Sequence, residues 1–288
     1  MPHNPPPAQG DELLLPEHRV LVFAGRDAIA FAHAQFMNDV AALPIGNWQW
    51  NGWLTPKGRV IALFALIKRD DQTLWLLLPD ADPRELAAAL QRFVFRSKLA
   101  IEVREDLVVS GSFSPPVRAS QARVSVVGDG IELDMGADGG PRGVRIGEGI
   151  GSATDGSGHW AAFDLEHGLP RLPPAQAGQW TPQQLSLDRL HAYSVRKGCY
   201  PGQEIVARTH FLGQAKRGLT LLEANAPLAP GAEVGDGTHV IGTLVSVATN
   251  HTGTTALAVL PLERDMASTL SAGNIALRER KLLTGLAR

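Results

Sequence analysis

Hydrophobic positions in the first hundred residues switch between strand-like and helix-like spacing. Residues 19–24, 59–68 and 73–78 are short apolar runs bounded by glycine, proline or charged residues, and each predicts a buried strand. Over 28–43 and 83–99 the apolar residues recur every three to four positions, which predicts two helices. This order of elements favours an α+β fold with a largely antiparallel sheet.

The pattern changes near residue 216. Short apolar runs separated by turn residues then follow one another, at 219–222, 240–247, 255–260 and 275–278. This spacing predicts a small C-terminal β-barrel over 216–288. We expect residues 13–215 to form the α+β region, and the proline-rich residues 1–12 to form a disordered tail.

One segment is too particular to be an ordinary loop. Residues 196–204 read Arg-Lys-Gly-Cys-Tyr-Pro-Gly-Gln-Glu and contain the chain's one cysteine, Cys199. A helix is predicted before it over 182–194, Gly198 suits the left-handed position that ends a helix, and residues 203–208 alternate like a strand. The residues alone leave two interpretations of Cys199 open, a small buried apolar side chain or a functional thiol.

Charge and composition narrow the classes of partner. Lysine and arginine number 27 against 29 aspartates and glutamates, a net charge of −2, so direct binding to nucleic acid is not expected. A single cysteine excludes an internal disulfide and an iron–sulfur cluster held by this chain alone, and no spacing typical of metal ligands predicts a metal site. The longest apolar run, 60–67, is too short to cross a membrane, and no signal peptide is visible. We therefore expect a cytoplasmic protein without a membrane partner.

The eight residues 197–204 resemble the signature K-G-C-[YF]-x-G-Q-E of the YgfZ family. These are folate-binding proteins related in fold to the aminomethyltransferase, or T-protein, of the glycine cleavage system. Residues 36–40, 54–60 and 93–98 resemble further segments of the family, as does the region around Trp160. The resemblance implies a three-lobed ring of T-protein type, with two interleaved α+β lobes and a C-terminal β-barrel around a central cavity.

The resemblance also implies a function. Proteins of this family bind tetrahydrofolate or a derivative and support the assembly or repair of iron–sulfur clusters, including those of tRNA-modifying enzymes. The implied partners are iron–sulfur client enzymes or assembly proteins. By position, Trp160 matches a tryptophan that contacts folate, whereas a second such tryptophan is replaced at about His18. Cys199 would be the essential thiol.

The neighbours of Cys199 have expected roles in the same site. Lys197 and Arg208 would supply positive charge for the thiolate or for the carboxylates of the folate tail. Gln203 and Glu204 would fix the loop or the pterin edge by hydrogen bonds, and Tyr200 is the loop's only large side chain. We expect these five residues, together with Trp160, to bind the folate.

Aminomethyl transfer itself is not expected. The aminomethyltransferases have acidic residues after a glycine turn, where this chain has Ala62 and Leu63, which cannot move a proton. The alternative hypothesis is a folate-dependent one-carbon transferase or demethylase that uses another acid, Glu204 or Asp39. A third is a structural adaptor in which Cys199 is inert. Folate binding, turnover and thiol reactivity separate the three.

Overall fold

The computed structural model describes residues 12–128, 130–148, 154–213, 215–250, 253–265 and 268–288, so the predicted tail lies outside the described residues except for residue 12. The helices are α1 (Ala28–Gln35), α2 (Pro83–Gln91), α3 (Ser157–Glu166) and α4 (Gln203–Leu212), with 3-10 turns η1 (Pro174–Gln176) and η2 (Leu187–Leu190). The strands are β1 (Leu13–Leu14), β2 (Arg19–Ala24), β3 (Asn47–Leu54), β4 (Val60–Lys68), β5 (Thr73–Leu78), β6 (Ala100–Val103), β7 (Val108–Ser112), β8 (Ser125–Val127), β9 (Gly130–Asp134), β10 (Gly143–Gly147), β11 (Thr154–Asp155), β12 (Arg217–Ala224), β13 (Glu233–Gly235), β14 (Val240–Asn250), β15 (Gly253–Pro261), β16 (Leu270–Ala272) and β17 (Ile275–Arg280). None of the described helices is long and apolar enough to cross a membrane.

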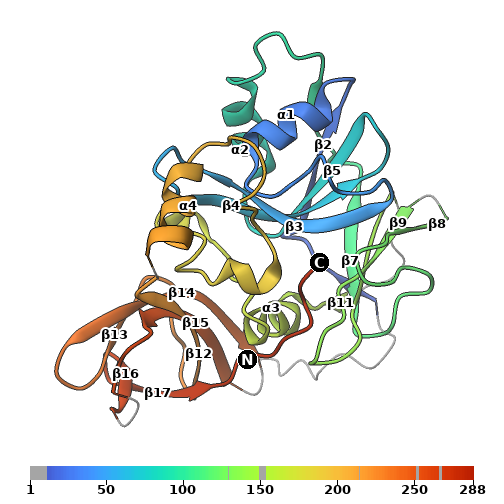
Figure 1. The fold of residues 1–288 in the computed structure, drawn as a ribbon. Coiled ribbons are helices and arrows are strands. Elements are labelled where there is room, and N and C mark those ends of the chain that lie inside the picture. The colour runs from blue at the N-terminus through green and yellow to red at the C-terminus, as the bar shows by residue number, and fades with distance from the viewer. Residues whose placement is uncertain (1–11, 129, 149–153, 214, 251–252, 266–267) are drawn as a thin grey trace.

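Two open sheets form the α+β part of the molecule (Figure 1). The first has the order β3-β4-β5-β2-β6, and its neighbouring strands all pair antiparallel. Helices α1 and α2 pack on it, because their apolar sides and alternate residues of the strands form one core cluster. The second sheet has the order β11-β1-β7-β10-β9-β8.

The C-terminal strands close into a six-stranded barrel in the order β12-β15-β14-β13-β16-β17. The four strands that the sequence predicts here are present, and the two that it does not predict, β13 and β16, have only three residues each. The predicted fold class, α+β with a C-terminal β-barrel, is confirmed.

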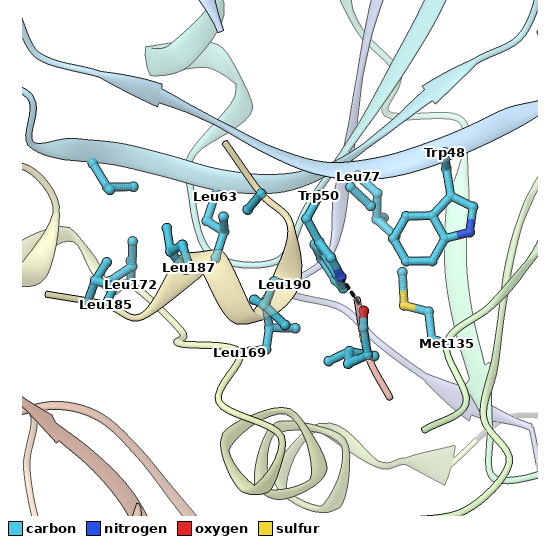
Figure 2. Packing of buried hydrophobic residues seen from close by; sticks show 14 of the residues in the cluster. Trp48, Trp50, Leu63, Leu77, Met135, Leu169, Leu172, Leu185, Leu187 and Leu190 are labelled. Atoms are coloured by element: carbon cyan, nitrogen blue, oxygen red, sulfur yellow. Dashed lines mark hydrogen bonds between the residues drawn. The ribbon is translucent and has the colours of Figure 1, made fainter. Parts of the chain in front are cut away.

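A single apolar core lies where the two sheets and the barrel meet. We call it the junction core; it includes Trp50, Leu63, Ile131, Trp160 and Val245, which come from all three units and from α3. Figure 2 shows leucines and tryptophans packed together in this region. The space at the centre of the molecule is therefore filled largely by side chains.

Both predicted N-terminal helices are shorter than expected. The helix predicted over 28–43 ends at Gln35, because Phe36 pairs with Trp53 of β3 and the next amide, Met37, donates to the carbonyl of Gly52 at 2.9 Å. The second ends at Gln91 rather than residue 99. The chain there turns back toward β6. The amide of Lys98 donates a hydrogen bond to the carboxylate of Asp27, just before α1, at 2.6 Å.

The predictions on either side of Cys199 are wrong. The helix predicted over 182–194 is a turn followed by the short 3-10 helix η2, and its leucines fill the junction core. Residues 203–208, predicted as a strand, are instead the start of α4. The prediction fails because six residues are too few to distinguish the spacing of a strand from that of a helix. The left-handed glycine is not Gly198 but Gly202, at φ +79°, just before α4.

Candidate functional site

Cys199 is exposed, on a loop that closes on itself. The hydroxyl of Ser194 accepts hydrogen bonds from the amides of Arg196 and Lys197, each at 3.2 Å. At the other end, the side-chain amide of Gln203 donates to the carbonyl of Lys197 at 3.2 Å. These bonds fix the backbone on both sides of the cysteine, and they leave its thiol on the surface.

Lys197 anchors this loop to the end of α1. Its side chain is buried, and Nζ donates to the carbonyls of His33, of Phe36 at 2.6 Å and of Asn38 at 3.4 Å. The last carbonyls of a helix lack partners within the helix, and the negative end of its dipole favours a cation. Burial lowers the pKa of Lys197 to about 8. The ammonium thus points toward the helix end, and it also lies 4.8 Å from the centre of the Tyr200 ring.

Tyr200 and Gln203 take part in holding the loop. Tyr200 is buried, and its hydroxyl donates to the carbonyl of Ser194 at 3.2 Å. Burial raises the pKa of this phenol above its ordinary value, so Tyr200 acts as a neutral hydrogen-bond donor. Glu204 and Arg208 are exposed on α4, one helical turn apart.

The cysteine loop packs against the turn between β3 and β4. A Cβ atom on Gly202 would lie 2.6 Å from the carbonyl oxygen of Thr55 and 2.7 Å from the Cα of Gly58. Gly58 is also left-handed, at φ +69°. Two glycines without side chains therefore let the two turns touch. The segments 36–40, 55–58 and 197–204, which the sequence analysis singles out separately, are neighbours in the fold.

Trp160 comes from α3 and lies in the junction core, to which Tyr200 of the cysteine loop also belongs. Trp160 is 1 % exposed, and the guanidinium of Arg142 lies 4.1 Å above its ring and 4.1 Å from that of Phe163. Arg142 is itself fully buried and pairs with Asp164 at 2.6 Å. A Cβ on Gly111 would lie 2.4 Å from the indole, so the backbone of β7 closes one side of it.

Beside Trp160 is a cavity of about 10 Å³, which has His18, Trp50 and Met135 among its walls. A space of this size accommodates no more than about one water molecule. Nδ1 of His18 is buried and has no hydrogen-bond partner among the described residues. The pKa of His18 lies well below its ordinary value, first because of burial and then because of the charges of Arg171, Arg142 and Arg19. His18 is therefore neutral at pH 7.

Sequence reasoning did not find the buried ion pairs next to this cavity. Arg171 binds Asp80 at 2.7 Å and extends toward Asp164, so the pairs Arg142–Asp164 and Arg171–Asp80 form one network. Their partners are 22 and 91 residues apart in the chain, and no local spacing signals them. Among the described residues, no group of three histidine, cysteine or acidic side chains could hold a metal ion.

No family model matches this chain. The chain is 28% identical over 261 residues to the tRNA-modifying protein YgfZ of Klebsiella pneumoniae, covering 81% of this chain and 80% of that protein. It is 28% identical over 270 residues to the tRNA-modifying protein YgfZ of Serratia proteamaculans, covering 83% and 81%. The resemblance to YgfZ proteins is confirmed. An uncharacterized protein of Haemophilus influenzae is 26% identical over 218 residues, with 73% and 72% covered.

The fold has a neighbour among the solved structures. The glycine cleavage system aminomethyltransferase T of Bartonella henselae superposes with a TM-score of 0.75, over 96% of this chain and 85% of that one, at 14% sequence identity. The likeness is one of fold. Ala62 and Leu63, where acidic residues are expected in an aminomethyltransferase, are buried apolar residues of β4.

Proposed function

We propose that this protein is a YgfZ-type, folate-binding accessory protein that supports the assembly or repair of iron–sulfur clusters, including those of tRNA-modifying enzymes. Cys199 is its functional thiol. Support comes from two relatives named as tRNA-modifying YgfZ proteins and from the aminomethyltransferase-like fold. The proposed partners are iron–sulfur client enzymes or assembly proteins, and the cytoplasm is the proposed location.

The observation that carries this proposal is the orientation of the cysteine loop. Lys197, Tyr200 and Gln203 direct their polar atoms at the protein, and the thiol of Cys199 is exposed. A loop built in this way presents a single sulfur ligand to a partner. One thiolate can supply one ligand to an iron atom in transit, although it cannot hold a cluster without further ligands.

Folate is assigned to the side of the junction core that contains Trp160. A reduced folate carries one-carbon groups when it is bound. The residues present suit its ring: Trp50 and Trp160 offer apolar faces, and the buried Nδ1 of His18 has no hydrogen-bond partner in the described part of the chain. The cavity of about 10 Å³ is too small for a pterin, so binding requires a rearrangement of this part of the core.

A tetrahydrofolate titration tests the folate part of the proposal. Saturable binding is expected, with quenching of tryptophan fluorescence. Trp160→Phe should weaken binding, and the matched variant Trp75→Phe should not, because Trp75 lies in β5 under Arg69 and does not line the cavity. Absence of saturable binding by the wild-type protein would contradict a folate-binding function. Turnover of a one-carbon substrate would instead favour the transferase hypothesis.

A further inference from the structure

Residues 281–288 follow the last barrel strand and run into the centre of the molecule. In Figure 1 this red segment leaves the barrel and passes α3 toward β3. It has no helix or strand of its own. Its residue Leu286 is nevertheless 1 % exposed and belongs to the junction core. The carbonyl of Leu286 accepts a hydrogen bond from the indole of Trp50 at 2.8 Å, drawn as the dashed line in Figure 2.

The first half of this segment is attached to α3 and to the loop after β9. The amide of Leu283 donates to the carbonyl of Glu166 at 2.9 Å. The amide and hydroxyl of Thr284 donate to one carboxylate oxygen of Asp138, at 3.0 and 2.6 Å. Thr284 is exposed, and the next residue, Gly285, is left-handed at φ +89°. The segment thus bends at a glycine between an exposed anchor and a buried leucine.

The second half of the segment 281–288 is bound to the residues on either side of Met135, a wall of the cavity beside Trp160. The guanidinium of Arg288 donates to the carbonyl of Asp134 at 3.1 Å and to that of Gly136 at 2.9 Å. Met135, between those two carbonyls, lines the small cavity beside Trp160, and so does Trp50. The segment therefore binds to two of the walls of this cavity.

We propose that residues 282–288 form a strap over a binding site for a flat heteroaromatic ring, and that Leu286 must leave its buried position before the ring can bind. The site is the space that Trp50, Trp160 and His18 would enclose once the strap has withdrawn. This inference rests on the proposed folate function, and it names the ring of reduced folate as the ligand. In the closed state the strap bonds to Trp50 and to the carbonyls on either side of Met135, two walls of a cavity that holds only about one water molecule.

Two observations point to a ligand rather than to a purely structural segment. His18 is 6 % exposed, lines the cavity and keeps Nδ1 without a hydrogen-bond partner among the described residues. Depending on the tautomer, this nitrogen of a neutral imidazole donates or accepts one hydrogen bond, and the polar edge of a pterin offers both N–H donors and ring-nitrogen or carbonyl acceptors. Residues 281–288 also have no helix or strand of their own, so the strap can withdraw without breaking a sheet or a helix, at the cost of the hydrogen bonds of residues 283, 284, 286 and 288.

A strap of this kind lowers the apparent affinity for the ligand by the fraction of molecules in which it is open. Leu286→Ala removes most of the apolar side chain that seats it. We expect this variant to bind tetrahydrofolate about tenfold more tightly than the wild-type protein, since burial of a leucine side chain is the main term lost. Leu260→Ala is the matched control, because it shortens an equally buried leucine in the separate core cluster of the barrel. It should leave the affinity unchanged.

Hydrogen–deuterium exchange of the wild-type protein gives an independent measurement. Saturating tetrahydrofolate should increase deuterium uptake in the peptide that contains residues 282–288, because the amide of Leu283 loses its bond to Glu166. Equal affinities of Leu286→Ala and the wild type, with unchanged or reduced exchange in this peptide, would overturn the strap while leaving folate binding intact. No binding by either protein would overturn the proposed function and the strap together.

Discussion

Replacing Gly202 with alanine should separate the cysteine loop from the β3–β4 turn. Gly202 is left-handed, which costs an alanine about 1–2 kcal/mol. The added Cβ would also lie 2.6 Å from the Thr55 oxygen and 2.7 Å from the Gly58 Cα, both backbone atoms that cannot rotate away. Overpacking of this kind costs a further ~1–3 kcal/mol. We expect Gly202→Ala to lower the free energy of unfolding by about 3 kcal/mol.

Two other glycines separate these contributions in urea unfolding followed by tryptophan fluorescence. Gly178 is left-handed at φ +74°, but a Cβ there meets no atom within 4 Å, so Gly178→Ala should cost about 1 kcal/mol. Gly198, in the cysteine loop itself, has neither a positive φ nor a close neighbour, and Gly198→Ala should change stability by less than ~0.5 kcal/mol. Equal effects of the alanines at 202 and 178 would refute the contact between the two turns.

Three further predictions concern buried charged or titratable groups. Lys197→Met should lower the free energy of unfolding by about 2 kcal/mol in urea titrations, because the carbonyls at the end of α1 lose their hydrogen-bond donor. Arg196→Met, at an exposed neighbouring position, should have little effect. Equal losses of stability in the two variants would contradict the anchoring role of Lys197. The pKa of His18 is lower in the folded than in the unfolded state, so the unfolded chain binds a proton at a higher pH than the folded protein does. The free energy of unfolding therefore falls as the pH drops below about 6.5, by up to ~1.4 kcal/mol per pH unit. His18→Gln should reduce the slope of stability against pH by that amount, and an unchanged slope would show that His18 is not buried neutral. Arg142→Met should cost about 3–5 kcal/mol, because Asp164 would stay buried with only its 3.5 Å contact to Arg171, and adding Asp164→Leu should recover part of that loss in the same assay; a further loss would argue against the pair.

The barrel could be predicted from the sequence because each of its longer strands is an apolar run bounded by turn residues. The lengths of the helices could not. Helical spacing continues past Gln35, but the backbone at Phe36 and Met37 pairs with β3, and no local pattern signals that competing contact. The start of α4 reads as a strand in the sequence, because alternation over six residues fits both structures. The boundaries at residues 12 and 215 stay predictions.

The candidate site could be predicted only in part. The motif around Cys199 marks the loop, and the structure decides between the two interpretations of its burial, because the thiol is exposed. The role of Lys197 is not predictable from the sequence, because its partners just after the end of α1, Phe36 and Asn38, lie more than 150 residues away in the chain. The same holds for the contact of Leu286 with Trp50, 236 residues apart. Contacts of this kind follow from the arrangement of the three units rather than from any local pattern.

The central claim is that Cys199 is the functional thiol of a YgfZ-type accessory protein. The most direct test is complementation of a bacterium that lacks its own YgfZ protein, read as the activity of an iron–sulfur enzyme in extracts. Wild-type protein should restore that activity. Cys199→Ser should fail to restore it while keeping the stability and the tetrahydrofolate affinity of the wild type, because the side chain is exposed and holds no structural contact of the loop. Full restoration by Cys199→Ser would contradict the claim.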